Sequence, residues 1–186
     1  MMTHTLARGW PAPFAFSFIH GEVIIDGRTL ERLTVRAVVS RDNGLLLVHS
    51  RVNGDLMFPG GGVEAGESHG AALARELKEE CGAELLAVGP LLGETREYRA
   101  AREPGFDAYC IHSLYYRCQI GEQLVAPQPQ PYEIRLGFEP GWFVLDDALQ
   151  TNKTLLAGPS PQWTARETRV LAQLQRWHQQ GLFGSG

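Results

Sequence analysis

The pattern of hydrophobic and polar residues predicts several strands in the first quarter of the chain. Residues 14–25 alternate and then become apolar, so they predict one or two short strands with a turn near Gly21. Residues 33–40 are rich in β-branched side chains, and residues 45–50 form an apolar return strand that we expect to be buried on both faces. Between them, residues 43–44 are an Asn-Gly pair, which is typical of a tight hairpin turn.

A helix is predicted after the glycine-rich segment 59–62. Apolar residues recur every fourth position between about residue 68 and residue 81, and they form one stripe along a helical surface. The glycine at position 82 is expected to end this helix, because glycine readily takes the left-handed conformation found at helix C-termini.

The second half of the chain predicts more strands and a terminal helix. Strand-like segments cover residues 85–97, interrupted by glycines, then residues 109–120 and 141–145, whereas residues 99–106 and 121–131 have the composition of loops. Thr164 and Glu167 are spaced as a capping box, which predicts a helix over about 164–180. This order of elements predicts one α/β domain over residues 1–186, with helices packed on a mixed sheet.

Composition narrows the classes of function. The net charge of -4 disfavours a general nucleic-acid-binding protein, which needs a basic surface, but it does not disfavour a small phosphorylated ligand held through a metal. No apolar run is long enough to span a membrane, and the N-terminus lacks the apolar core of a signal peptide. Cys81, Cys110 and Cys118 have no zinc-site spacing, so we expect reduced thiols and a cytoplasmic protein.

Three glutamates mark the candidate chemistry. Glu76, Glu79 and Glu80 stand at i, i+3 and i+4 on the predicted helix, so they share one face. Three carboxylates crowded together repel one another unless a cation lies between them, and hard oxygen ligands suit Mg²⁺ or Mn²⁺. Taken alone, such a cluster is more often a solvated surface.

The glycine loop adds a second feature to this cluster. Gly60, Gly61 and Gly62 let the backbone approach a ligand closely, and a loop that leads into a helix offers N–H groups to anions. A simple turn explains the same three glycines. Together with the acidic face, they indicate a site for phosphate and metal.

The segment 61–83 resembles the signature of the Nudix family. That signature is a glycine, five residues, a glutamate, seven residues and then R-E-U-x-E-E-x-G-U, where U is a bulky aliphatic residue. The matching residues are Gly61, Glu67, Arg75, Glu76, Leu77, Glu79, Glu80 and Gly82. The last position departs from the pattern because it holds the small Ala83.

The resemblance implies an α/β/α sandwich and a hydrolase that cleaves a nucleoside diphosphate linked to another group X. Glu76, Glu79 and Glu80 would bind the metal, while Arg75 and Glu67 would hold the loop and orient the acids. In the family the general base varies. A helix glutamate, such as Glu79 or Glu80, can serve, and so can a glutamate on a later loop.

Outside the signature, Glu139 is the first candidate for the base and Glu133 the second, although an exposed loop acid explains either residue equally well.

The substrate is left open by the sequence, with a preference for nucleoside triphosphates or related nucleotides. A catalytically silent module that binds a nucleotide or a protein partner is the alternative, but such a module is expected to have lost acids that are all present here. A homodimer is common in the family, so a homodimer is the expectation for this chain.

Overall fold

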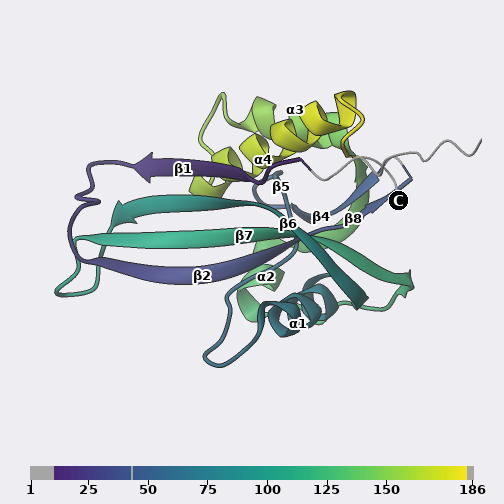
Figure 1. Ribbon diagram of the computed structural model, residues 1–186, viewed down its shortest axis with the longest axis horizontal. Coiled ribbons are helices and arrows are strands. Elements are labelled where there is room, and N and C mark those ends of the chain that lie inside the picture. The colour runs from purple at the N-terminus through teal and green to yellow at the C-terminus, as the bar shows by residue number, and fades with distance from the viewer. Residues whose placement is uncertain (1–10, 43, 184–186) are drawn as a thin grey trace, which may run out of the picture.

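A computed structural model describes residues 11–42 and 44–183 (Figure 1). Its elements are, in chain order, β1 (Phe14–His20), β2 (Thr29–Val38), β3 (Ser40–Arg41), β4 (Gly44–Ser50), β5 (Leu56–Met57), α1 (His69–Cys81), β6 (Ala83–Ala100), β7 (Ala108–Leu124), α2 (Pro131–Leu136), β8 (Phe138–Val144), α3 (Leu145–Leu155) and α4 (Gln162–Gln179).

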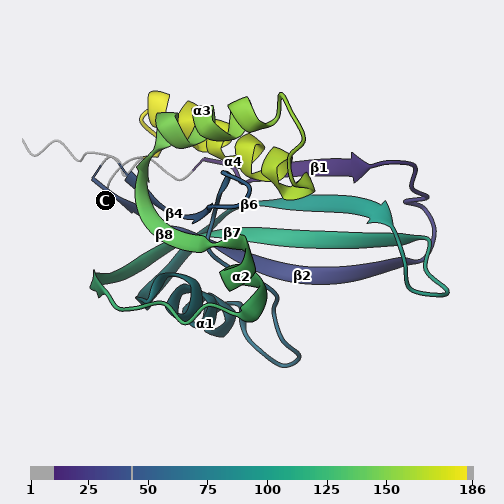
Figure 2. The same ribbon diagram turned by 180° about the vertical axis from the view of Figure 1, so that it is seen from behind.

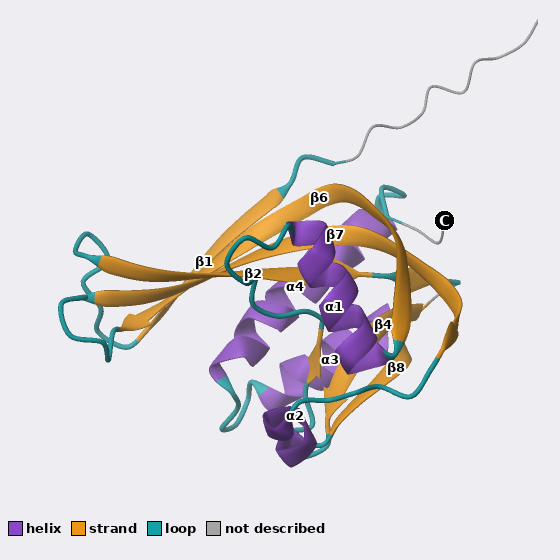
Figure 3. Cartoon of the chain, turned by 90° about the horizontal axis from the view of Figure 1, so that it is seen from below, coloured by secondary structure: helices purple, strands orange, loops and turns teal. Residues whose placement is uncertain are grey.

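Two sheets organise these elements. The larger has the strand order β1-β6-β7-β2, in which β1 pairs with β6 and β2 with β7 in parallel, while β6 and β7 pair antiparallel. The smaller sheet contains β3, β4 and β5, and β8 pairs with β4. The four strands of the larger sheet project past the helices at one end (Figure 3).

Helices lie on both sides of the sheets, with α3 and α4 on one side and α1 and α2 on the other (Figures 1 and 2). This arrangement is the expected α/β/α sandwich with a mixed sheet, and the predicted fold class is confirmed.

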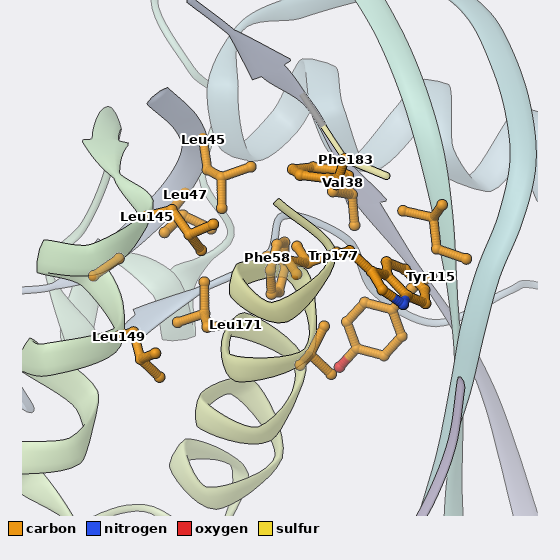
Figure 4. Close-up of a cluster of buried hydrophobic side chains, with 14 of the residues drawn as sticks. Val38, Leu45, Leu47, Phe58, Tyr115, Leu145, Leu149, Leu171, Trp177 and Phe183 are labelled. Carbon is orange, nitrogen blue, oxygen red and sulfur yellow. The ribbon is translucent and has the colours of Figure 1, made fainter. Parts of the chain in front are cut away.

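Two hydrophobic clusters fix the helices to the sheets. On the α4 side, the rings of Tyr115 and Phe58 are 5.6 Å apart between centroids, and Trp177 lies in the same cluster (Figure 4). The ring of Phe14 lies 5.6 Å from that of Tyr115 and 5.8 Å from that of Trp177. On the α1 side, the apolar stripe predicted for the helix is buried against strand residues from β2, β4 and β7. Because this packing fixes the orientation of α1 on the sheet, its acidic residues are held at a fixed place beside the sheet.

Most strands agree with the predictions, with two differences in the second half. The hairpin is confirmed by the pairing of Arg41 with Gly44, although Asn43 lies outside the described residues. The glycines in residues 85–97 do not divide the segment into two strands, because β6 absorbs them as register shifts and runs on to Ala100. The loop predicted over 99–106 is shortened by β6, and the loop predicted over 121–131 is shortened because β7 runs to Leu124. The helix α2 was not predicted.

The capping box predicted at the start of the last helix is wrong. The helix α4 begins at Gln162 after Pro161, so Thr164 is already inside its first turn. Both residues of the supposed box have tertiary partners instead. The Thr164 hydroxyl donates to Asp55, and Glu167 accepts a hydrogen bond from the backbone N–H of Phe58 at 3.2 Å.

Within residues 11–42 and 44–183, none of the helices has the length and apolar character that crossing a membrane requires.

Candidate active site

The helix α1 carries the three glutamates to the edge of a cleft. Its N-terminus is capped by the Ser68 side chain, which accepts a hydrogen bond from Ala71, and Gly82 ends it in the left-handed conformation, as predicted. The side chains of Glu76 and Glu80 are nearly buried, whereas that of Glu79 is 28% exposed. The three acids thus lie on one side of the helix but differ in their exposure to solvent.

The glycine loop touches two of these acids directly. The N–H of Gly60 donates to Glu80 Oε2 at 2.7 Å. Gly60 has a φ of +139°, and a Cβ there would lie 2.0 Å from the Val35 carbonyl oxygen, so no other residue fits. A Cβ on Gly61 would lie 2.3 Å from Glu76 Oε1. The loop therefore lets backbone and carboxylates come close together.

Arg75 ties the loop to the helix. Its guanidinium donates to both carboxylate oxygens of Glu67 at 3.1 and 3.0 Å, to the carbonyl of Gly62 at 2.9 Å and to Glu76 at 2.7 Å. Glu79 is 3.9 Å from the same guanidinium. The hydrogen bond from Arg75 lowers the pKa of Glu67, which stays ionised and keeps this bridge in place.

The buried acids lack full electrostatic compensation. Burial raises the pKa of Glu76, against the opposing effect of Arg75. Burial also raises the pKa of Glu80 to about 8, and the nearby charges of Glu76 and Glu133 act in the same direction. Arg36 and the Gly60 N–H oppose this shift only in part. A cation at this place would favour the ionised carboxylates.

The two candidates for the general base lie in different surroundings. Glu133 on α2 is buried, accepts a hydrogen bond from the Gln130 N–H at 2.7 Å and lies close enough to Glu80 to raise its pKa. Glu139 on β8 is 58% exposed and pairs with Arg51 at 3.2 Å. Neither glutamate is among the residues that line the cleft. The structure brings Glu133 to the helix acids but does not bring Glu139 there.

The cleft beside α1 has a volume of about 470 Å³. Its walls come from strands of both sheets, from α1, α2 and α4 and from the glycine loop. Several charged residues that line the cleft were not predicted from the sequence, namely His20, Arg32, Arg36, Glu97, Arg99 and Arg166. Of these, only Arg36 has a sequence signal, since it is a lone charge within the apolar segment 33–40.

Comparison with known proteins identifies the family to which the chain belongs. The NUDIX domain model matches residues 30–166, which include α1, the glycine loop and most of the cleft. The chain belongs to the Nudix family. A search among curated proteins found no match.

Solved structures with a similar fold include three bacterial proteins. The ORF135 protein of E. coli has 28% identity and a TM-score of 0.48, with 66% of this chain and 79% of that chain covered. A MutT NUDIX hydrolase from Burkholderia pseudomallei has 23% identity and a TM-score of 0.45, covering 75% and 97%. The mMutator MutT protein from Bacillus halodurans has 19% identity and a TM-score of 0.45, covering 64% and 72%. The family assignment rests on the domain model.

Membership confirms the resemblance drawn from the signature. The chain is a Nudix pyrophosphohydrolase, a class that acts on nucleoside diphosphates linked to a group X. The signature runs from the glycine loop through α1 to its C-cap Gly82 and the first residue of β6, so the family pattern corresponds to one continuous structural unit.

The donor set of this Nudix site fits a divalent cation. Glu76 and Glu80 offer hard carboxylate oxygens to the cleft, and their mutual repulsion is a strain that a cation relieves. In the described ranges, no three carboxylate, imidazole or thiol side chains are already gathered as a metal cage. The third acid, Glu79, instead accepts a hydrogen bond from Gln130 at 3.3 Å.

Proposed function

We propose that this Nudix protein is a divalent-metal-dependent hydrolase of nucleoside triphosphates or related nucleotides. The observation that carries the proposal is the pair of buried acids, Glu76 and Glu80, in one cleft with the glycine loop. Burying two carboxylates side by side is costly unless the site serves a cation. Their burial with only partial charge compensation supports a metal role over a surface role.

Glu76, Glu79 and Glu80 are the proposed metal ligands, and Mg²⁺ or Mn²⁺ is the proposed cofactor. When bound, such a cation would offset charge on the diphosphate oxygens and make a nearby water more acidic. Arg75 is proposed to act by holding Glu76 and the loop in place, because its guanidinium contacts both.

The reaction requires a water oxygen to attack phosphorus while the bond from phosphorus to the bridging oxygen breaks. The proton leaves the attacking water to a carboxylate, and the bridging oxygen departs with the leaving phosphate. We favour Glu133 over Glu139 as the acceptor, since Glu133 lies beside Glu80 and Glu139 is paired with Arg51 on the surface.

The glycine loop is proposed to face the phosphate groups. Gly60, Gly61 and Gly62 all line the cleft next to the acids. The N–H of Gly60 is already used by Glu80, so it positions the carboxylate rather than the substrate. Gly61 and Gly62 remain the proposed contacts of the loop with substrate.

A phosphate-release assay over a nucleotide panel tests the function. Wild-type protein, Glu80→Gln and the matched control Glu84→Gln are compared with and without Mg²⁺, with a phosphatase added to reveal products. Glu84 is an exposed acid on β6 outside the cleft, so its variant should keep full activity. Metal-dependent turnover that falls by about a hundredfold or more in Glu80→Gln supports the proposal. Turnover that persists in excess chelator would refute it.

A second pair of variants tests the base. Glu133→Gln should lower kcat strongly at unchanged thermal stability, while Glu139→Gln should leave kcat within about twofold of wild type. The reverse order would return the assignment to Glu139.

A further inference from the structure

The cleft contains a second charged region, away from the helix acids. Arg32 on β2 and Arg99 on β6 both line it, and both project from the same face of the larger sheet. The register shows this directly, because Arg32 pairs with Ile111 and Arg99 with Tyr109, two residues of β7 that share a face. The two arginines therefore flank one strand.

Two other cationic side chains of the cleft, Arg166 and His20, lie beside acidic side chains. Arg166 is buried between Glu97 and Glu167, and His20 lies 3.4 Å from Glu97. In the described part of the chain, neither Arg32 nor Arg99 has an acidic partner.

Arg99 lies over the ring of Tyr109, 4.2 Å from its centroid, and makes one long hydrogen bond to a backbone carbonyl. Two guanidinium groups thus lack compensating negative charge at this end.

The backbone positions of these arginines lie away from the acidic end of the cleft, although the Arg32 side chain reaches back to Gly62. Arg36 marks that end, because it donates to the carbonyl of Gly60, whose N–H binds Glu80. At about 3.3 Å per strand residue, Arg32 lies about 13 Å farther along β2. Arg99 is level with Leu30, about 20 Å from Arg36 by the same measure. A diphosphate held at the acids does not extend as far as Arg99.

We propose that Arg32 and Arg99 bind a phosphomonoester on the part of the substrate that extends beyond the scissile diphosphate. The guanidinium of Arg32 leans toward the loop, since its Nη2 atom is 3.0 Å from where a Cβ of Gly62 would lie, while Arg99 lines the same cleft farther along the sheet.

A phosphomonoester suits this position because it carries close to two charges and several acceptor oxygens, which match two guanidinium groups. This inference rests on the proposed function for the place of the diphosphate.

Matched substrates that differ by one phosphomonoester test the proposal. NADPH is compared with NADH, and coenzyme A with dephospho-coenzyme A, by kcat/KM in the presence of Mg²⁺. We expect the phosphorylated member of at least one pair to be preferred by about tenfold or more, and the preference to fall at high salt. Arg99→Gln and Arg32→Gln should each reduce this ratio about tenfold.

Arg96→Gln is the control, because Arg96 lies on the same strand but on the opposite face, where it pairs with Glu31. It should leave the ratio unchanged. Equal kcat/KM within both pairs, or an equal loss of preference in Arg96→Gln, would overturn the proposal.

Direct binding separates this proposal from the proposed function. Calorimetry compares adenosine 2′,5′- and 3′,5′-bisphosphate with AMP on wild-type protein, Arg99→Gln and Arg96→Gln. One bisphosphate should bind wild type and Arg96→Gln about tenfold more tightly than AMP, and Arg99→Gln should lose this difference. Such binding without any hydrolysis would contradict the hydrolase but support this site. Hydrolysis without any preference for the phosphorylated compound, in turnover or in binding, would support the hydrolase but contradict this site.

Discussion

Adding one methyl group at Gly60 or at Gly61 separates the role of the loop in folding from its role at the acids. The two glycines are neighbours, but a Cβ would meet different atoms at each. At Gly60 it would lie 2.0 Å from the backbone oxygen of Val35, which is held in β2. At Gly61 it would lie 2.3 Å from the carboxylate of Glu76, the far end of a side chain that can rotate.

The expected magnitudes follow from what has to move. Gly60→Ala combines a backbone clash with a φ of +139°, so we expect a loss of roughly 3 kcal/mol in the free energy of unfolding. For a chain of this size that lowers Tm by about 6–12 °C. Gly61→Ala should cost less than about 1 kcal/mol, but it pushes the Glu76 carboxylate by about 1 Å, and a displacement of that size at a catalytic group can cost about a hundredfold in rate.

Thermal unfolding and metal-dependent turnover are measured on both variants under the same conditions. Gly60→Ala should lose stability first, whereas Gly61→Ala should keep a Tm near that of wild type and lose turnover. Full turnover in Gly61→Ala, or equal drops in Tm for both variants, would show that the contact with Glu76 is not what requires the glycine.

Two further predictions concern buried charge. Because the pKa of Glu80 is raised from 4.5 to about 8, the folded protein binds more protons than the unfolded chain between these pH values, so the metal-free protein should lose stability as the pH rises from about 5 to 8. Thermal unfolding in chelator should show a smaller decline for Glu80→Gln, and an identical decline would contradict the assignment. Arg166→Met leaves Glu97 and Glu167 buried without their cation, which should cost about 3–5 kcal/mol in urea unfolding, and a loss below about 1 kcal/mol would show that the pair is not strongly coupled.

The acidic helix could be predicted from the sequence because its information is local. Ser68, the apolar stripe and Gly82 define the start, the buried face and the end of α1 within fifteen residues. Once the helix is known, the spacing of the glutamates places them on one side of it. The same reasoning failed for Thr164 and Glu167, where the local pattern of a capping box was overridden by tertiary hydrogen bonds to Asp55 and Phe58.

The other charged residues of the cleft come from distant parts of the chain, and this is why the sequence does not show them. Glu97 and Arg166 are 69 positions apart in the chain and meet only because α4 packs across the sheet. Glu133 and Glu139 have similar loop-like contexts in the sequence, yet one is buried beside Glu80 and the other pairs with Arg51. Burial separates the two acids, and burial here depends on where α2 lies in the fold.

The division between local and distant residues has a consequence for specificity. The acids and Arg75 come from one helix, so we expect a change there to alter the reaction for every substrate. Arg32 and Arg99 come from two strands that do not pair with each other and meet the cleft only through the register of β7. A substitution at either arginine leaves α1 and its contacts in place. We therefore expect the choice of substrate to change through these strand positions, while the hydrolytic chemistry stays with the helix.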